Sequence, residues 1–308
     1  MLQEIELDRD STRPETAEKA LRDGCFLVRH SIPSTLLDDA YGLLEDFFRL
    51  PAEVKAESAG PAGGLGFVPA APGAADWKEL FHWGAQLPDG HPLLRRFPDR
   101  YPRPVWPDHL VPGFSSVLKQ LHGEMRDFQL KVVDTISRMI GVDGRFFREM
   151  LTDGPVVNRA SWYPPMESAS SDQQVWAVAH TDQDLITMLP RATSGGLEVL
   201  TGGTWVPVTP PDGHAVINAG VVLERLSNGR ITAPLHRVSA PSNSTGRLSI
   251  VQFCHPTPWT VISPLQHDGG REVPEYPAIT AADLFDKTMY ERHVEKDQIL
   301  TGAGQVTS

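Results

Sequence analysis

Residues 156–259 consist of short β-type runs separated by turn residues, and this pattern limits the possible folds more than any other feature of the chain. Two Gly-Gly pairs and Asn228-Gly229 mark chain reversals, and the last should form a hairpin between strands at 221–223 and 231–232. Many short strands at close spacing are typical of β-sandwiches and jelly rolls. We therefore predict a mainly β fold with supporting α-helices and a double-stranded β-helix (jelly roll) core.

Helical patterns occur before this region. Residues 14–23 are expected to form a short helix that ends at Gly24, and a strand should follow at 25–28. An amphipathic helix is predicted at 33–50. The clearest helix spans about 112–140, where apolar residues recur with a helical period and form a stripe that should face the core.

A single domain of 308 residues is expected, because sheet-rich folds of this size are often one unit. Within it, 1–155 should be a mostly helical N-terminal part, 156–260 the jelly-roll core, and 261–308 a C-terminal helix and tail. Gly, Pro and Ala dominate 59–75, which is either an exposed connection or a lid over a binding site.

One short motif, His180-Thr181-Asp182, has the residue types and spacing of a metal site. Positions i and i+2 of a strand project from the same face, so both side chains can reach one ion. A second extended run carries His236, which a chain reversal within a sheet fold can bring back to the pair. Two imidazoles and one carboxylate are the ligands of non-haem ferrous iron, with positions left open for oxygen and an organic co-ligand.

The alternative for each of these histidines is an ordinary core or surface residue. Further residues weigh against that alternative for the trio. Arg247 and Ser249 form another i, i+2 pair on a predicted strand, and a guanidinium beside a hydroxyl makes a socket for a carboxylate. Tyr163, just before a Pro-Pro break, supplies another donor. The remaining histidines lack a partner at ligand spacing and are expected to be structural or exposed: His30, His82, His91, His109, His122, His214, His255, His267 and His293.

In this order the motifs resemble the 2-oxoglutarate and Fe(II)-dependent dioxygenases of the isopenicillin N synthase-like family. The matching segments are Trp162-Tyr163-Pro164-Pro165, His180-Thr181-Asp182, Gly195-Gly196-Leu197-Glu198-Val199, Ile217-Asn218-Ala219-Gly220, Leu235-His236-Arg237-Val238 and Arg247-Leu248-Ser249. The resemblance implies that His180, Asp182 and His236 bind iron. It also implies that Arg247 and Ser249, with Tyr163, bind the distal carboxylate of 2-oxoglutarate.

The cofactors implied by this resemblance are Fe(II), 2-oxoglutarate as co-substrate, and O2. The expected reaction couples oxidative decarboxylation of 2-oxoglutarate to hydroxylation, desaturation or cyclisation of a small molecule. The alternative is an iron-dependent oxidase or cyclase of the same fold that does not use 2-oxoglutarate. Asp182 argues against halogenation, because halogenating relatives carry a small residue at that position.

The substrate is expected to be an amino acid or a natural-product intermediate, as for similar proteins. Candidate residues that face it are Trp162, Gln183, Asp184 and Glu198, together with side chains from the Gly/Pro-rich segment and from a C-terminal helix near 281–296. Nothing in the sequence indicates an oligomeric state.

Charge and cysteine content limit the other partners. The formal net charge is −11 and no basic cluster occurs, which disfavours nucleic acid or a membrane surface as a partner. The N-terminus lacks a long apolar segment. Cys25 and Cys254, the only cysteines, have no zinc-type spacing and are expected to be buried thiols in a reducing cytoplasm.

Overall fold

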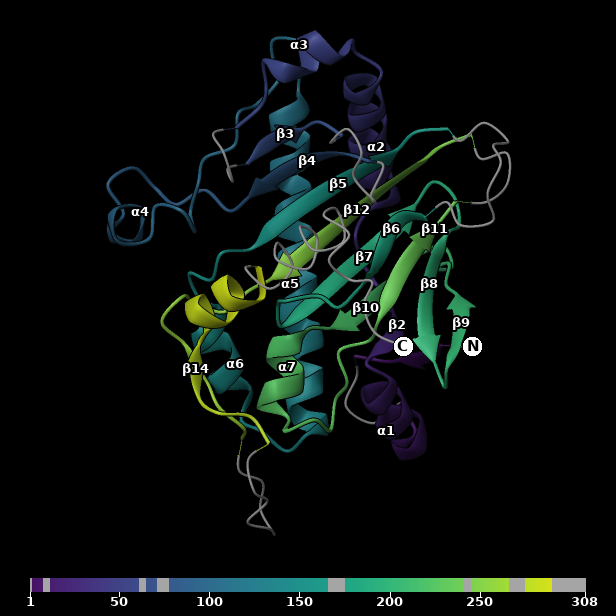
Figure 1. Cartoon of the computed structure of the whole chain (residues 1–308), viewed down its shortest axis with the longest axis vertical. Coiled ribbons are helices and arrows are strands. Elements are labelled where there is room, and N and C mark those ends of the chain that lie inside the picture. The colour runs from purple at the N-terminus through teal and green to yellow at the C-terminus, as the bar shows by residue number, and fades with distance from the viewer. Residues whose placement is uncertain are drawn as a thin grey trace, which may run out of the picture.

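The computed structural model describes residues 2–7, 12–60, 65–70, 78–165, 175–240, 245–265 and 275–289. Two β-sheets lie face to face, and helices cover the outer side of the larger one (Figure 1). The jelly-roll prediction is therefore confirmed.

The larger sheet has eight strands in the order β1-β2-β10-β7-β12-β5-β4-β3. Their bounds are Gln3–Ile5 (β1), Cys25–Arg29 (β2), Gly66–Val68 (β3), Glu79–Gly84 (β4), Val157–Tyr163 (β5), Ile186–Ala192 (β7), His214–Ala219 (β10) and Arg247–Cys254 (β12). Only β1 runs parallel to its neighbour; the other pairs are antiparallel. Strands from both ends of the chain thus share one sheet.

The smaller sheet has the order β6-β11-β8-β9. Its strands are Val175–His180 (β6), Leu197–Thr201 (β8), Thr204–Pro207 (β9) and His236–Ser239 (β11). As expected from the sequence, Gly202 and Gly203 connect β8 to β9, with φ of 57° and 79°. A third, two-stranded sheet pairs β13 (Val261–Ile262) with β14 (Ile279–Thr280).

Seven helices have defined bounds among the described residues: Pro14–Asp23 (α1), Ser34–Phe48 (α2), Ala52–Ala56 (α3), Pro92–Arg96 (α4), Phe114–Met139 (α5), Gly144–Leu151 (α6) and Val221–Leu226 (α7). Residues 281–289 are also helical. The predicted helices at 14–23, 33–50 and 112–140 are confirmed as α1, α2 and α5.

The long helix α5 supports the larger sheet from outside. Its apolar stripe is buried, and the Gln129 side chain, also fully buried, donates hydrogen bonds to the carbonyl oxygens of Ile186 on β7 (3.3 Å) and Gln252 on β12 (2.9 Å). These two bonds anchor the helix across neighbouring strands that carry site residues.

The turn predicted at Asn228-Gly229 is present, but the segments on either side of it are not strands, so the predicted hairpin is wrong. Both residues have positive φ, 53° and 80°, so the chain does turn there. The preceding segment, however, forms α7, whose Val222, Leu223 and Leu226 are buried at helical spacing. A short apolar run does not by itself distinguish a strand from a buried helix, and here packing selected the helix.

Gly24 ends α1 with φ of 67° and touches the segment that precedes β11. A Cβ at this position would lie 1.7 Å from the carbonyl oxygen of Thr232. We expect Gly24→Ala to lower the free energy of unfolding by roughly 3 kcal/mol or more, through backbone strain and this clash. Urea unfolding followed by circular dichroism measures the change.

The matched control is Gly42→Ala, in the exposed interior of α2, where an added Cβ meets nothing within 4 Å. It should stabilise the protein by about 0.5–1 kcal/mol, because alanine favours a helix over glycine. Equal effects of the two substitutions would contradict the steric explanation.

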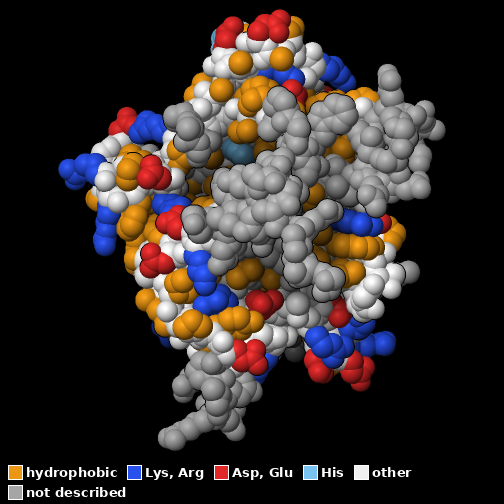
Figure 2. Space-filling view, in the orientation of Figure 1, with side chains coloured by type: hydrophobic (Ala, Val, Ile, Leu, Met, Phe, Trp, Pro, Cys, Tyr) orange, Lys and Arg blue, Asp and Glu red, His pale blue; other side chains and the backbone are white. Residues whose placement is uncertain are grey.

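Several sequence predictions lie wholly or partly outside the described residues. Within 59–75, β3 forms at Gly66–Val68, and residues 61–64 and 71–75 are outside, so the lid stays a prediction. The same holds for the tail from 290 onward. In the described part of the chain, no helix is long and apolar enough to cross a membrane. On the face in Figure 2, acidic and basic side chains of the described surface are intermixed.

Candidate active site

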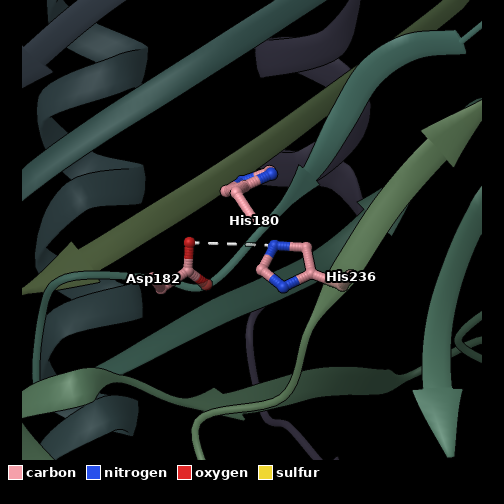
Figure 3. Close-up of side chains that lie close together, drawn as sticks. All are labelled: His180, Asp182 and His236. Carbon is pink, nitrogen blue, oxygen red and sulfur yellow. Dashed lines mark ion pairs between the residues drawn. The ribbon is translucent and has the colours of Figure 1, made fainter. Parts of the chain in front are cut away.

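The two sequence-distant histidines are neighbours across two paired strands. His180 is the last residue of β6, and His236 is the first residue of β11. Their Cα atoms are paired in the sheet register, and the ring centroids lie 4.4 Å apart. Figure 3 shows both rings and the Asp182 carboxylate converging on one point. The antiparallel pairing of β6 and β11 thus brings His236 to the motif.

Asp182 lies in the loop after β6 and not within the strand that the sequence predicted. Hydrogen bonds, and not strand pairing, hold this loop in position. The Val221 N–H donates to the Asp182 carbonyl oxygen (2.9 Å), and the Asp184 carboxyl accepts from the Cys254 N–H (3.0 Å) and the Thr187 hydroxyl (3.2 Å). The loop is therefore anchored to α7 and to two strands of the larger sheet.

Both imidazoles present Nε2 to the site. His180 Nδ1 lies 2.8 Å from the Val178 carbonyl oxygen, and His236 Nδ1 lies 3.1 Å from that of Pro234. A carbonyl oxygen only accepts, so each Nδ1 carries a proton, and in a neutral ring this leaves the Nε2 lone pair for a metal ion. Burial, together with the neighbouring His236, lowers the pKa of His180 to about 4, so its ring is neutral at pH 7.

The carboxylate completes a set that fits a metal ion. Asp182 is 6% exposed, and its Oδ1 lies 3.8 Å from His236 Nε2. Burial alone would raise the pKa of Asp182, but the adjacent His236 and His180 hold it below its ordinary value. Its Oδ2 is buried without a hydrogen-bond partner, which is costly unless an ion binds there. The three ligand atoms all lie within 4.8 Å of one another.

A small cavity of about 70 Å³ joins this trio to the predicted carboxylate socket. On neighbouring strands, Tyr163 is paired with Arg247 and Ser161 with Ser249. The Arg247 guanidinium is 2% exposed, donates to Ser249 Oγ (2.8 Å), and lies 5.2 Å from the centre of the Tyr163 ring. The structure therefore brings the three metal-type ligands and the Arg-Ser-Tyr group around one cavity.

A second cavity of about 750 Å³ lies beside the first, and Arg159 lines both. Its volume is typical of a small-molecule site. Gln183, next to Asp182 in the chain, lines this larger cavity, as expected for a residue that faces the substrate.

The C-terminal helix near 281–296, also predicted to face the substrate, contributes Ala281, Ala282, Phe285 and Met289 to the larger cavity, whereas the other three single residues predicted to do so line neither cavity. Trp162 points to the opposite side of β5, where it stacks on Phe48 with ring centroids 6.1 Å apart. Asp184 has no exposed surface, and burial together with Asp182 raises its pKa well above the ordinary range. Glu198 pairs with Arg237 (2.7 Å) instead of facing a cavity. We assign these three side chains structural roles.

Sequence reasoning missed Arg159, His82 and His255, which line the larger cavity. A signal for Arg159 was present, because it is two residues before Ser161 and four before Tyr163, on the same face of one strand. His82 and His255 carried no such signal. They reach the cavity because β4 pairs with β5 and because β12 ends beside it.

Comparisons with known proteins agree with this geometry. Residues 152–256 match the model of the 2OG-Fe(II) oxygenase superfamily, and residues 5–109 match the family described as non-haem dioxygenase in morphine synthesis N-terminal. The chain is 30% identical to gibberellin 20 oxidase 2 of Oryza sativa, over 92% of this chain and 71% of that protein. This chain belongs to the 2OG-Fe(II) oxygenase superfamily. It is a 2-oxoglutarate- and Fe(II)-dependent dioxygenase that acts on a small molecule.

Other relatives of this oxygenase include naringenin,2-oxoglutarate 3-dioxygenase of Matthiola incana, 29% identical over 89% of this chain and 75% of that protein. Among solved structures, a 2OG-Fe(II) oxygenase family protein from Caulobacter crescentus has a TM-score of 0.81 and 30% identity, and covers 94% of this chain and 98% of its own. A Neurospora crassa protein solved in complex with alpha-KG and 5-formyluracil has a TM-score of 0.79 and 26% identity, and covers 94% of this chain and 95% of its own.

Two partly buried histidines, His122 and His255, make the oxygenase sensitive to acid. Burial lowers the pKa of both His255 and His122 from 6.5 to about 4. Between pH 6.5 and about pH 4, both histidines are protonated in the unfolded chain and neutral in the folded protein. The free energy of unfolding is therefore unaffected by these histidines above pH 6.5. It decreases as the pH falls toward 4, by up to about 1.4 kcal/mol per pH unit for each group.

Urea unfolding at several pH values between 7 and 4.5 tests this. His255→Phe keeps an aromatic ring against Phe285, whose centroid lies 5.7 Å away, and removes one titrating group. The variant should therefore lose stability less steeply with falling pH than the wild type. The same slope in both proteins would contradict the assignment.

Proposed function

We propose that His180, Asp182 and His236 hold Fe(II), and that Arg247, Ser249 and Tyr163 bind the distal carboxylate of 2-oxoglutarate. The observation that carries this assignment is the shared cavity of about 70 Å³, which all six side chains line. A guanidinium fork with a hydroxyl beside it suits a carboxylate, and the two-histidine, one-carboxylate set suits ferrous iron with open positions.

When bound, Fe(II) supplies the oxidising chemistry with 2-oxoglutarate and O2, and the residues of the chain supply position and environment. The Nδ1–carbonyl bonds orient the two imidazoles and keep each Nε2 available to the ion. Asp182 brings one negative charge. Leu189, Leu197 and Val216 line the same cavity and exclude water from the reacting groups.

We infer that the substrate occupies the larger cavity and undergoes hydroxylation, desaturation or cyclisation. Gln183 and Arg159 line this cavity near the trio, and relatives such as gibberellin 20 oxidase 2 and flavone synthase are named for small organic molecules. We also propose a single catalytic domain, because β1–β4 join the same sheet as β5, β7, β10 and β12. The free, buried thiols of Cys25 and Cys254 favour a cytoplasmic location.

Anaerobic titration tests the assignment. Addition of Fe(II) and then 2-oxoglutarate should produce a metal-to-ligand absorption band, and aerobic turnover with substrate should release succinate. Oxygen consumption that proceeds equally well without 2-oxoglutarate would instead establish the oxidase alternative. Absence of any absorption band would refute the proposed co-substrate site.

A further inference from the structure

Prolines and other apolar residues make up most of the wall of the larger cavity. Five of its residues are prolines, which have no backbone N–H and a fixed φ: Pro98, Pro102, Pro155, Pro256 and Pro258. Leu65, Val157, Val222 and Phe285 extend this rigid, apolar lining. Arg100 and Arg103 also line the cavity, and each is paired with an acidic residue, Asp286 and Asp89 respectively. The wall therefore suits a largely hydrocarbon framework.

One polar side chain of the larger cavity lies where it meets the smaller cavity with the iron-type ligands. Arg159 lines both cavities; its Nε donates to His82 Nε2 at 2.8 Å, and its guanidinium lies 4.8 Å from the centre of the Phe253 ring. Burial lowers the pKa of His82 well below its ordinary value, so that ring is a neutral acceptor. His82 and Phe253 thus hold the guanidinium in one orientation at the junction of the cavities.

The electrostatics at this junction favour an anion. Among the described residues that line the smaller cavity, the cations are Lys78, Arg159 and Arg247, and the only carboxylate is Asp182. An ammonium group of a ligand placed beside Arg159 would meet like charge, whereas a carboxylate would meet a planar donor that matches its geometry.

Building on the proposed function, we propose that the substrate is an apolar carboxylic acid whose carboxylate binds Arg159, with His82 as a positioning residue for that guanidinium. The rest of the substrate lies against the proline-rich wall. Of the two substrate classes expected from the sequence, the proposal excludes free α-amino acids, because such a substrate would place its ammonium group near the Arg159 guanidinium.

Three probes of one framework test the proposal: 4-phenylbutyrate, its neutral amide, and 2-amino-4-phenylbutyrate. Binding is measured by calorimetry to anaerobic protein saturated with Fe(II) and 2-oxoglutarate. We expect the acid to bind at least about tenfold more tightly than either other probe, the gain typical of a charge-assisted hydrogen bond. Equal affinities, or no binding of the acid at millimolar concentration, would overturn the proposal.

Variants then assign the preference to residues. Arg159→Gln should abolish the preference for the acid, and Arg159→Lys should keep part of it. His82→Ala should reduce it, and His82→Gln, which retains an acceptor, should restore it. Arg237→Gln changes an arginine that pairs with Glu198 away from both cavities and should have no effect.

Three outcomes separate this proposal from the assignment of the co-substrate site. A wild-type protein that forms the absorption band with 2-oxoglutarate but ignores the charge of the probe refutes the substrate class alone. If the wild-type protein forms no absorption band with Fe(II) and 2-oxoglutarate, the proposed function itself is refuted. If Arg159→Gln weakens 2-oxoglutarate binding and leaves the acid preference intact, Arg159 serves the co-substrate and the proposal fails. Circular dichroism confirms that each variant is folded.

Discussion

His180→Ala and His236→Ala should each lower the affinity for Fe(II) by more than about 100-fold and abolish succinate release. Loss of an outer-shell partner alone typically costs 10- to 100-fold in metal affinity, and these substitutions remove a ligand itself. The remaining imidazole and Asp182 cannot complete the set. Metal content after dialysis and anaerobic Fe(II) titration measure the effect.

His109→Ala is the matched control for these variants. The His109 side chain is 59% exposed and lies 3.4 Å from Glu57, an exposed partner outside both cavities. It should bind iron as the wild type does. Full iron occupancy in His180→Ala or His236→Ala would remove that residue from the ligand set.

Arg247→Ala should weaken 2-oxoglutarate binding by about 30- to 4,000-fold, the range that follows from a loss of 2–5 kcal/mol when one partner of a buried charge pair is removed. The guanidinium is buried, and its geometry is fixed by Ser249 Oγ and by the Ser194 carbonyl oxygen, which Nε reaches at 3.2 Å. Iron binding should survive, because Arg247 is not a ligand. Anaerobic titration of the Fe(II) protein with 2-oxoglutarate measures the change.

Two further variants test whether the loss of 2-oxoglutarate affinity is specific to the Arg247 guanidinium. Arg247→Lys keeps the charge and loses the planar fork, so its affinity for 2-oxoglutarate should be intermediate. Arg237→Ala removes an arginine that contacts Glu198 away from both cavities and should leave the affinity unchanged. Unaltered 2-oxoglutarate binding in Arg247→Ala would show that the distal carboxylate is held elsewhere.

Much of the candidate site was accessible from the sequence because its signals are local. The i, i+2 spacing of Arg247 and Ser249 places both on one face of β12, and the structure puts both at the cavity. The Pro-Pro pair ends β5 at Tyr163, as predicted. The helical period of α5 likewise required only the distribution of apolar residues along one segment.

Predictions failed where the answer depends on which segments are neighbours. Glu198 and Trp162 flank cavity-lining residues in the chain, but alternation turns their side chains to the other face. Asp182 lies outside the predicted strand because its loop is held by the Val221 N–H and by the buried Asp184. These contacts join segments that are far apart in the sequence. The 221–226 segment became a helix because its apolar residues are buried by packing at that spacing.

The sequence by itself determined the chemistry available to this protein. Short-range spacing indicated the β-rich fold class and the residue types of the proposed iron set and carboxylate anchor, and the family resemblance implied their roles. Only the tertiary structure decided which side chains meet. The β6–β11 pairing brings His236 to His180, and the β4–β5 pairing brings His82 to Arg159. The physical reason is that strand pairing and the inward face of each strand are set by contacts between distant segments.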